Sequence, residues 1–209
     1  MQIQSSHLRF ATAPEAALRA ELAQILGRSP RLTQVLSRLR DLDLPQWRLV
    51  SGALYNQVWN DLTGRPEMYG VKDIDVFYFD PDTSYGAEDR VIQRLAAAIP
   101  GTPPVEVRNQ ARVHLWYAQH FGRAYAPLTS VEEGIDRFAS RTHMVGIRLL
   151  PDDTLDIYAP AGLRDIFAFR LTPNPVQDNR ETHEAKAARQ SALWPEIEVV
   201  PWPTADPAT

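Results

Sequence analysis

The chain has 209 residues, 44% of them hydrophobic, which is enough for one domain with a sizeable buried core. Its formal net charge of −4 argues against a general nucleic-acid-binding surface, and the absence of cysteine excludes disulfides, thiolate metal sites and a cysteine nucleophile. No apolar run reaches the roughly 18 residues of a membrane span, and the first residues lack the pattern of a secretion signal, so we expect a cytoplasmic protein without membrane contacts.

Two helices are expected at the start of the chain. Residues 12–15, Thr-Ala-Pro-Glu, have the form of a capping box, and the apolar residues that follow keep helical spacing as far as Gly27. A second helix begins at Ser29 and carries an apolar face formed by Leu32, Val35, Leu36 and Leu39. We expect residues 1–45 to form a helical appendage to a single main domain.

A short strand is predicted at residues 47–50 and a helix at residues 53–62. The small residues Ser51 and Gly52 make the turn between the strand and the helix. Residues 63–70 have the composition of a loop, and the next strand follows them.

Residues 71–79, Val-Lys-Asp-Ile-Asp-Val-Phe-Tyr-Phe, are the most informative stretch. Their β-branched and aromatic residues predict a strand, on which Asp73 and Asp75 point to the same face, roughly 6 to 7 Å apart. Two carboxylates so close repel each other, and burying them is costly unless a cation neutralises them. A hard divalent cation is therefore one interpretation, and an exposed acidic pair that protects an edge strand from aggregation is the other.

Helices and strands continue to alternate beyond this strand. We expect the aromatic residues Trp116 and Tyr117 to lie in the core and residues 196–209 to form a loose tail. The mixture predicts an α/β (α+β) fold, with a small mixed β-sheet flanked by helices. The remaining expected elements are a helix at 88–99, a strand at 105–108, a helix at 113–122, a helix at 130–138, a hairpin at 142–150 and 154–158, and helices at 163–169 and 179–194.

The order strand, small-residue turn, helix and Asp-x-Asp strand resembles the nucleotidyltransferase superfamily that includes DNA polymerase β. Within it, the chain is similar to an uncharacterised bacterial nucleotidyltransferase-like family over about residues 32–202. Two features depart from the superfamily pattern. The small residues read Ser-Gly instead of Gly-Ser, and the loop before Asp73 lengthens the usual spacing. The segments that carry the closer resemblance are 51–60, 72–80, 105–117 and 158–169.

The resemblance implies transfer of a nucleoside monophosphate from an NTP to a hydroxyl group, with Mg2+ or Mn2+ held by Asp73 and Asp75. A third carboxylate is expected on a neighbouring strand, where it would bind metal or deprotonate the hydroxyl. Glu106 and Asp156 both stand between apolar residues. We favour Glu106, because its strand follows the next helix, as in the family, whereas Asp156 has the pattern of an outward-facing hairpin residue.

Four residues are candidates for binding the nucleotide. Ser51 and Gly52 would hold the triphosphate, because glycine permits close approach and a helix N-terminus attracts anions. Asn56 would face the nucleotide and Arg108 its phosphates, although each also fits an ordinary surface position.

The acceptor is expected to be a small molecule or a protein, since no basic face for nucleic acid is evident. The alternative is a non-catalytic module of the same fold that senses nucleotides or binds a partner. A two-metal phosphohydrolase is a third, weaker interpretation.

Overall fold

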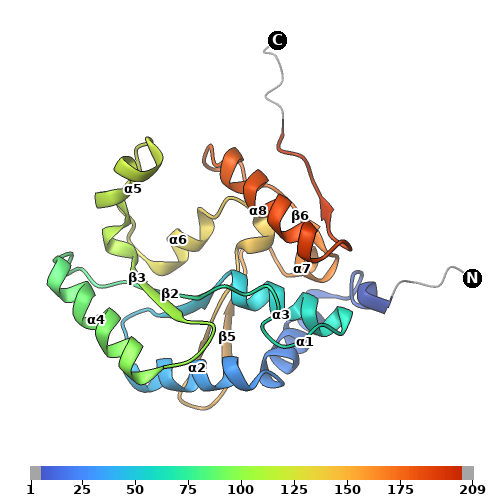
Figure 1. Ribbon diagram of the computed structural model, residues 1–209, viewed down its shortest axis with the longest axis horizontal. Helices are drawn as coiled ribbons and strands as arrows, with labels where there is room; N and C mark the ends of the chain where they lie inside the picture. Colours follow the sequence, from blue (N-terminus) through green and yellow to red (C-terminus); the bar gives the residue numbers. More distant parts are fainter. Residues whose placement is uncertain (1–5, 204–209) are drawn as a thin grey trace, which may run out of the picture.

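The computed structural model describes residues 6–203, and its centre is a mixed sheet with helices around it (Figure 1). The strand order is β3-β2-β1-β4-β5. Strands β2 and β3 are parallel, and every other neighbouring pair in this sheet is antiparallel. This confirms the predicted small mixed sheet. The strands are β1 (Arg48–Val50), β2 (Ile74–Tyr78), β3 (Val105–Asn109), β4 (Gly146–Leu149) and β5 (Leu155–Tyr158).

The helices are α1 (Glu15–Gly27), α2 (Pro30–Leu42), α3 (Gly52–Thr63), α4 (Tyr85–Ala98), α5 (Val113–Phe121), α6 (Val131–Asp136), α7 (Arg164–Phe167) and α8 (Arg180–Leu193), with 3-10 turns η1 (Ser6–Leu8), η2 (Gln110–Arg112) and η3 (Arg141–His143). Helix α4 begins earlier than expected, because Ser84 caps it by accepting a hydrogen bond from the backbone N–H of Ala87. The capping box at residues 12–15 does not form. Its Glu15 instead accepts a hydrogen bond from the backbone N–H of Leu163.

The main hydrophobic core lies on one face of the sheet. Ile74, Val76 and Tyr78 of β2 point into it, together with buried residues of α1 and α2. The helices expected as an appendage therefore share one core with the sheet. Because strand residues alternate between faces, Asp75 and Phe77 project from the opposite face.

The opposite face is covered in part by α6. A smaller apolar cluster lies there, around Val131 and Ile135 of α6. An ion network adds to this contact, since the buried Arg48 of β1 pairs with Glu132 of α6 at 2.8 Å and with Asp156 of β5 at 3.1 Å. Helix α6 is thus fixed over one end of the sheet, and the Asp75 end is left uncovered by it.

Residues 196–203 are held in place, contrary to the expectation of a loose tail. Strand β7 (Glu198–Val199) pairs in parallel with β6 (Arg170–Leu171), and the backbone N–H groups of Glu198 and Val200 donate to carbonyls of Phe169 and Leu171. These backbone bonds were not visible as a sequence pattern, because each strand has only two residues. Residues 204–209 lie outside the described part of the chain. No helix among the described residues is long and apolar enough to cross a membrane.

Candidate active site

Asp75 and Glu106 lie on adjacent parallel strands at the same level of the sheet. Asp75 is opposite Glu106, and two residues further on Phe77 is opposite Arg108. Partners in register project from the same face, so both carboxylates point away from the main core. Asp73 stands one residue before β2 and two before Asp75. The chain therefore brings the Asp-x-Asp pair and Glu106 to one end of the sheet face that lies opposite the main core.

Asp156 lies elsewhere. Its strand β5 is separated from β2 by β1 and β4. Its carboxylate accepts hydrogen bonds from Arg48 at 3.1 Å and from Arg148 at 2.7 Å. Asp156 is therefore part of the ion network that holds α6, and Glu106 is the carboxylate that neighbours Asp75.

The carboxylates carry more negative charge than the surrounding residues neutralise. Burial and then the negative charge of Asp73 raise the pKa of Asp75 to about 6, with a smaller contribution from Glu106. Lys186 and Arg108 oppose this shift without cancelling it. Glu106 forms a salt bridge with Arg108 at 3.0 Å, and both side chains are nearly half exposed. A nearby cation would therefore stabilise the ionised form of Asp75.

The donor atoms fit a hard divalent cation, although the side chains are not gathered around one point. Within residues 6–203, no three Asp, Glu or His side chains form a metal-binding group. Asp73, Asp75 and Glu106 nevertheless offer only oxygen ligands, which Mg2+ and Mn2+ prefer. Burial and the repulsion from Asp73 raise the pKa of Asp75, and a bound cation would reverse that rise.

Strand β1 is antiparallel to β2, and Leu49 is opposite Val76. The residues after Leu49 therefore run toward the start of β2, and the Ser51-Gly52 turn lies beside it. Ser51 is buried and has a φ of 56°, a value that non-glycine residues rarely adopt. Its N–H donates to the carbonyl of Val145 at 2.9 Å, which holds it there. Such strain is typical of functional turns.

The first turn of α3 is not tightly packed around Gly52. A Cβ on Gly52 would meet only the Tyr55 hydroxyl at 3.8 Å and the Asn56 amide at 3.9 Å, which are ordinary contacts. Asn56 is 1% exposed, and its Oδ1 has no hydrogen-bond partner among the described residues. A buried amide oxygen without a partner is costly, so a ligand donor at this position would be stabilising.

A buried hydrogen-bonded chain joins α8 to this turn. The amide of Gln190 donates to the Tyr55 hydroxyl at 2.7 Å, and its Oε1 lies 3.2 Å from Nε2 of His143. The imidazole of His143 stacks on the Tyr55 ring, with the centroids 4.7 Å apart. Burial raises the pKa of Tyr55 to about 12 and lowers that of His143 well below its ordinary value, so both groups stay neutral.

Lys186 of α8 is a site residue that sequence reasoning missed. Loss of hydration lowers its pKa, and the negative charge of Asp75 opposes this. Its ammonium group makes no hydrogen bond or salt bridge to any described residue. The only signal in the sequence was that Lys186 is one of two lysines, and the other, Lys72, is exposed.

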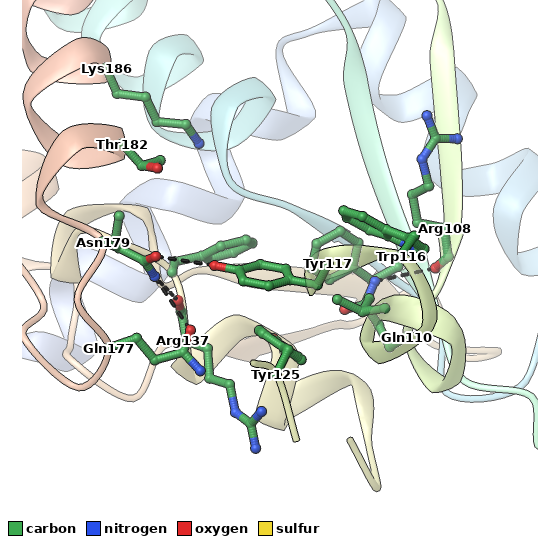
Figure 2. Close-up of a pocket in the computed structure, with 15 residues that line it drawn as sticks. Arg108, Gln110, Trp116, Tyr117, Tyr125, Arg137, Gln177, Asn179, Thr182 and Lys186 are labelled. Carbon is green, nitrogen blue, oxygen red and sulfur yellow. Dashed lines mark hydrogen bonds between the residues drawn. The ribbon is translucent and has the colours of Figure 1, made fainter. Parts of the chain in front are cut away.

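A pocket of about 220 Å3 adjoins the carboxylates. Its lining includes Phe77, Arg108 and Lys186. Phe77 comes two residues after Asp75 on β2, and Arg108 comes two residues after Glu106 on β3. Figure 2 shows Lys186 extending from α8 toward the pocket and Tyr117 crossing it.

The expectation that Trp116 and Tyr117 lie in the core was wrong. Both line the pocket, and Trp116 is 40% exposed.

Comparison with known proteins identifies the family of this chain. A family model described as nucleotidyltransferase matches residues 37–199. The chain is also similar to a solved structure described as an NMR structure that reveals a CCA-adding enzyme head domain. The TM-score is 0.74 and the identity 25%, and the match covers 92% of this chain and 100% of that one. The comparison with curated proteins found no match. Because the family model spans most of the chain, this protein belongs to the nucleotidyltransferase family and is an enzyme that transfers nucleoside monophosphates.

Proposed function

We propose that the enzyme uses Mg2+ or Mn2+ to transfer a nucleoside monophosphate from an NTP to a hydroxyl group of a small-molecule or protein acceptor. The observation that carries this proposal is the register of Asp75 with Glu106, beside the Ser51-Gly52 turn. The net charge of −4 supports an acceptor other than a long nucleic acid.

Asp73, Asp75 and Glu106 would hold the cation, which stabilises negative charge on the attacking and leaving oxygens when bound. In the reaction the acceptor oxygen bonds to the α-phosphorus, and the bond from that phosphorus to the bridging oxygen breaks, releasing pyrophosphate. The proton of the acceptor hydroxyl passes to a carboxylate. Glu106 is suited to this role, because it neighbours Asp75 and its side chain is open to solvent.

The phosphates of the NTP would lie along the start of α3. Ser51 and Gly52 present a helix N-terminus, and Asn56 presents a buried amide beside it. Lys186 and Arg108 supply positive charge from the α8 and β3 sides. These groups bind and orient the α-phosphate so that the acceptor oxygen can attack in line.

A second candidate is a nucleotide-binding module without turnover. The absence of a gathered three-carboxylate group among the described residues and the salt bridge between Glu106 and Arg108 favour it. The two candidates differ in whether the α-phosphate leaves the nucleotide.

The test is transfer of label from each α-32P-labelled NTP to nuclease-treated small-molecule and protein fractions of a cell extract. We expect labelled product and pyrophosphate with Mg2+ or Mn2+, loss of both in Asp75→Asn, and wild-type activity in the exposed-site control Asp41→Asn. Tight NTP binding without transfer or pyrophosphate release, for every fraction and nucleotide, would favour the second candidate. Release of orthophosphate alone would indicate hydrolysis.

A further inference from the structure

We propose that the pocket between α5, α6 and α8 holds the base and sugar of the donor NTP, with the base stacked on Trp116 and Tyr117. The inference rests on the proposed function and specifies where that site binds its nucleoside. Neither aromatic residue was expected to contact a ligand.

The position of the pocket along the sheet supports this assignment. The Ser51-Gly52 turn lies toward the start of β2, Asp75 follows, and Phe77 at the pocket comes two residues later. Two strand residues span roughly 6.6 Å. The groups of an NTP follow the same order, with the terminal phosphates at the turn, the α-phosphate at Asp75 and the nucleoside in the pocket. Because the nucleoside is covalently attached to the α-phosphorus, it must lie within this short distance of Asp75.

The lining of the pocket has the chemistry of a nucleotide site. Five of the fifteen described lining residues are aromatic, and among them Tyr117 lies between Trp116 at 6.1 Å and Tyr125 at 4.3 Å, measured between ring centroids. Arg108 and Lys186 bring positive charge, and none of the described lining residues is acidic. In Figure 2 Lys186 and Arg108 lie above Tyr117 on either side. Aromatic faces with cations at the rim suit a planar base that carries phosphate.

Tyr117 is fixed before any ligand binds. Its hydroxyl donates to Oδ1 of Asn179 at 3.1 Å, and the Asn179 amide in turn donates to the carbonyl of Arg137 at 3.4 Å (Figure 2). This explains why Asn179 does not cap α8 with its side chain, as its place before the helix would allow. The pocket volume is below the roughly 300 Å3 of a pocket for a whole drug-sized ligand. It therefore suits a base and sugar, with the triphosphate outside.

The experiment is titration calorimetry of the full chain with each of the four NTPs and with inorganic tripolyphosphate, in the presence of Mg2+. We compare wild type with Trp116→Ala and with the matched control Leu115→Ala, a neighbour on α5 that is 54% exposed and does not line the pocket. Loss of one stacking ring should weaken the binding of the preferred NTP about 10-fold or more. Tripolyphosphate should bind all three proteins equally.

A second pair of variants fills the pocket from α8. Thr182→Trp places a large side chain in the pocket, and the control Ala185→Trp places it on the exposed side of the same helix. We expect only Thr182→Trp to lose NTP affinity while it retains affinity for tripolyphosphate. This pair keeps the test decisive if Trp116→Ala fails to fold.

The outcomes separate this proposal from the proposed function. Equal NTP affinity in wild type, Trp116→Ala and Thr182→Trp would overturn the assignment of the pocket to the nucleoside, but it would not contradict the proposed triphosphate site. That result is expected if the pocket holds the acceptor instead. Absence of NTP and tripolyphosphate binding to wild type would overturn both. Parallel losses for NTP and tripolyphosphate in the pocket variants would show that the pocket holds phosphates instead of the base.

Discussion

Replacing Asp75 with Asn should stabilise the metal-free protein at neutral pH. In the folded chain Asp75 is largely buried next to Asp73, and its pKa rises from 3.8 to about 6. Asparagine keeps the shape of the side chain and removes the charge. The variant thus isolates the energetic cost of ionising this carboxylate when metal is removed by a chelator.

The size of the effect follows from the pKa. A carboxylate with a raised pKa in the folded state binds more protons there than in the unfolded state, so stability falls as the pH rises between the two pKa values. Each pKa unit corresponds to about 1.36 kcal/mol, so ionised Asp75 costs the folded state about 3 kcal/mol above pH 6 to 7. The cost is absent below about pH 3.8, where the carboxyl is protonated in both states.

Urea unfolding of wild type and Asp75→Asn at pH 4, 5, 6 and 7.5, with EDTA, measures this difference. The variant should gain on wild type as the pH rises from 4 to about 6.5, by roughly 2.4 kcal/mol over the assayed range, and the difference should then level off. Excess Mg2+ should narrow the gap, because a ligand of the folded state stabilises wild type. The exposed-site control Asp41→Asn should show no such trend. A stability difference that stays constant from pH 4 to 7.5 would refute the reasoning about Asp75.

Four further substitutions test the remaining assignments. Glu106→Gln should abolish transfer while NTP affinity stays within about 3-fold of wild type, whereas Asp156→Asn should transfer normally; the reverse pattern in a transfer assay would move the base role to Asp156. Lys186→Met should weaken NTP binding about 10- to 100-fold by calorimetry, since a charge-assisted hydrogen bond contributes about 1.5 to 3 kcal/mol, and unchanged affinity would remove Lys186 from the phosphate site. Arg48→Ala should lower the free energy of unfolding by about 3 kcal/mol, because it leaves partly buried carboxylates unpaired; a loss below about 0.5 kcal/mol in urea unfolding would show that this ion network contributes little.

The part of the site that could be predicted from the sequence depends on local pattern. Period-two spacing places Asp73 and Asp75 on one face, and the helix between the two strands makes their parallel pairing the expected one. Glu106 could therefore be preferred from chain order. The structure places it opposite Asp75, and its catalytic role stays a prediction.

The parts that could not be predicted depend on long-range packing. The charge of Lys186 acts on Asp75 only because α8, far downstream in the chain, packs beside α3 through Gln190 and Tyr55. The helical spacing of α5 indicates an apolar face, but the sequence does not show that Trp116 faces a pocket instead of the core. In both cases the spacing within one element carries no information about the element packed against it.

The central claim is that Asp75 lies in a cation-dependent nucleotide site, and the most direct measurement is calorimetry of NTP binding with Mg2+ and with EDTA. We predict that wild type binds its preferred NTP with Mg2+ and at least about 10-fold more weakly with EDTA, since the carboxylates repel an unneutralised triphosphate. Asp75→Asn should lose most of this dependence on Mg2+. Equal affinity of wild type with Mg2+ and with EDTA, or an equal response of Asp75→Asn to Mg2+, would contradict the account.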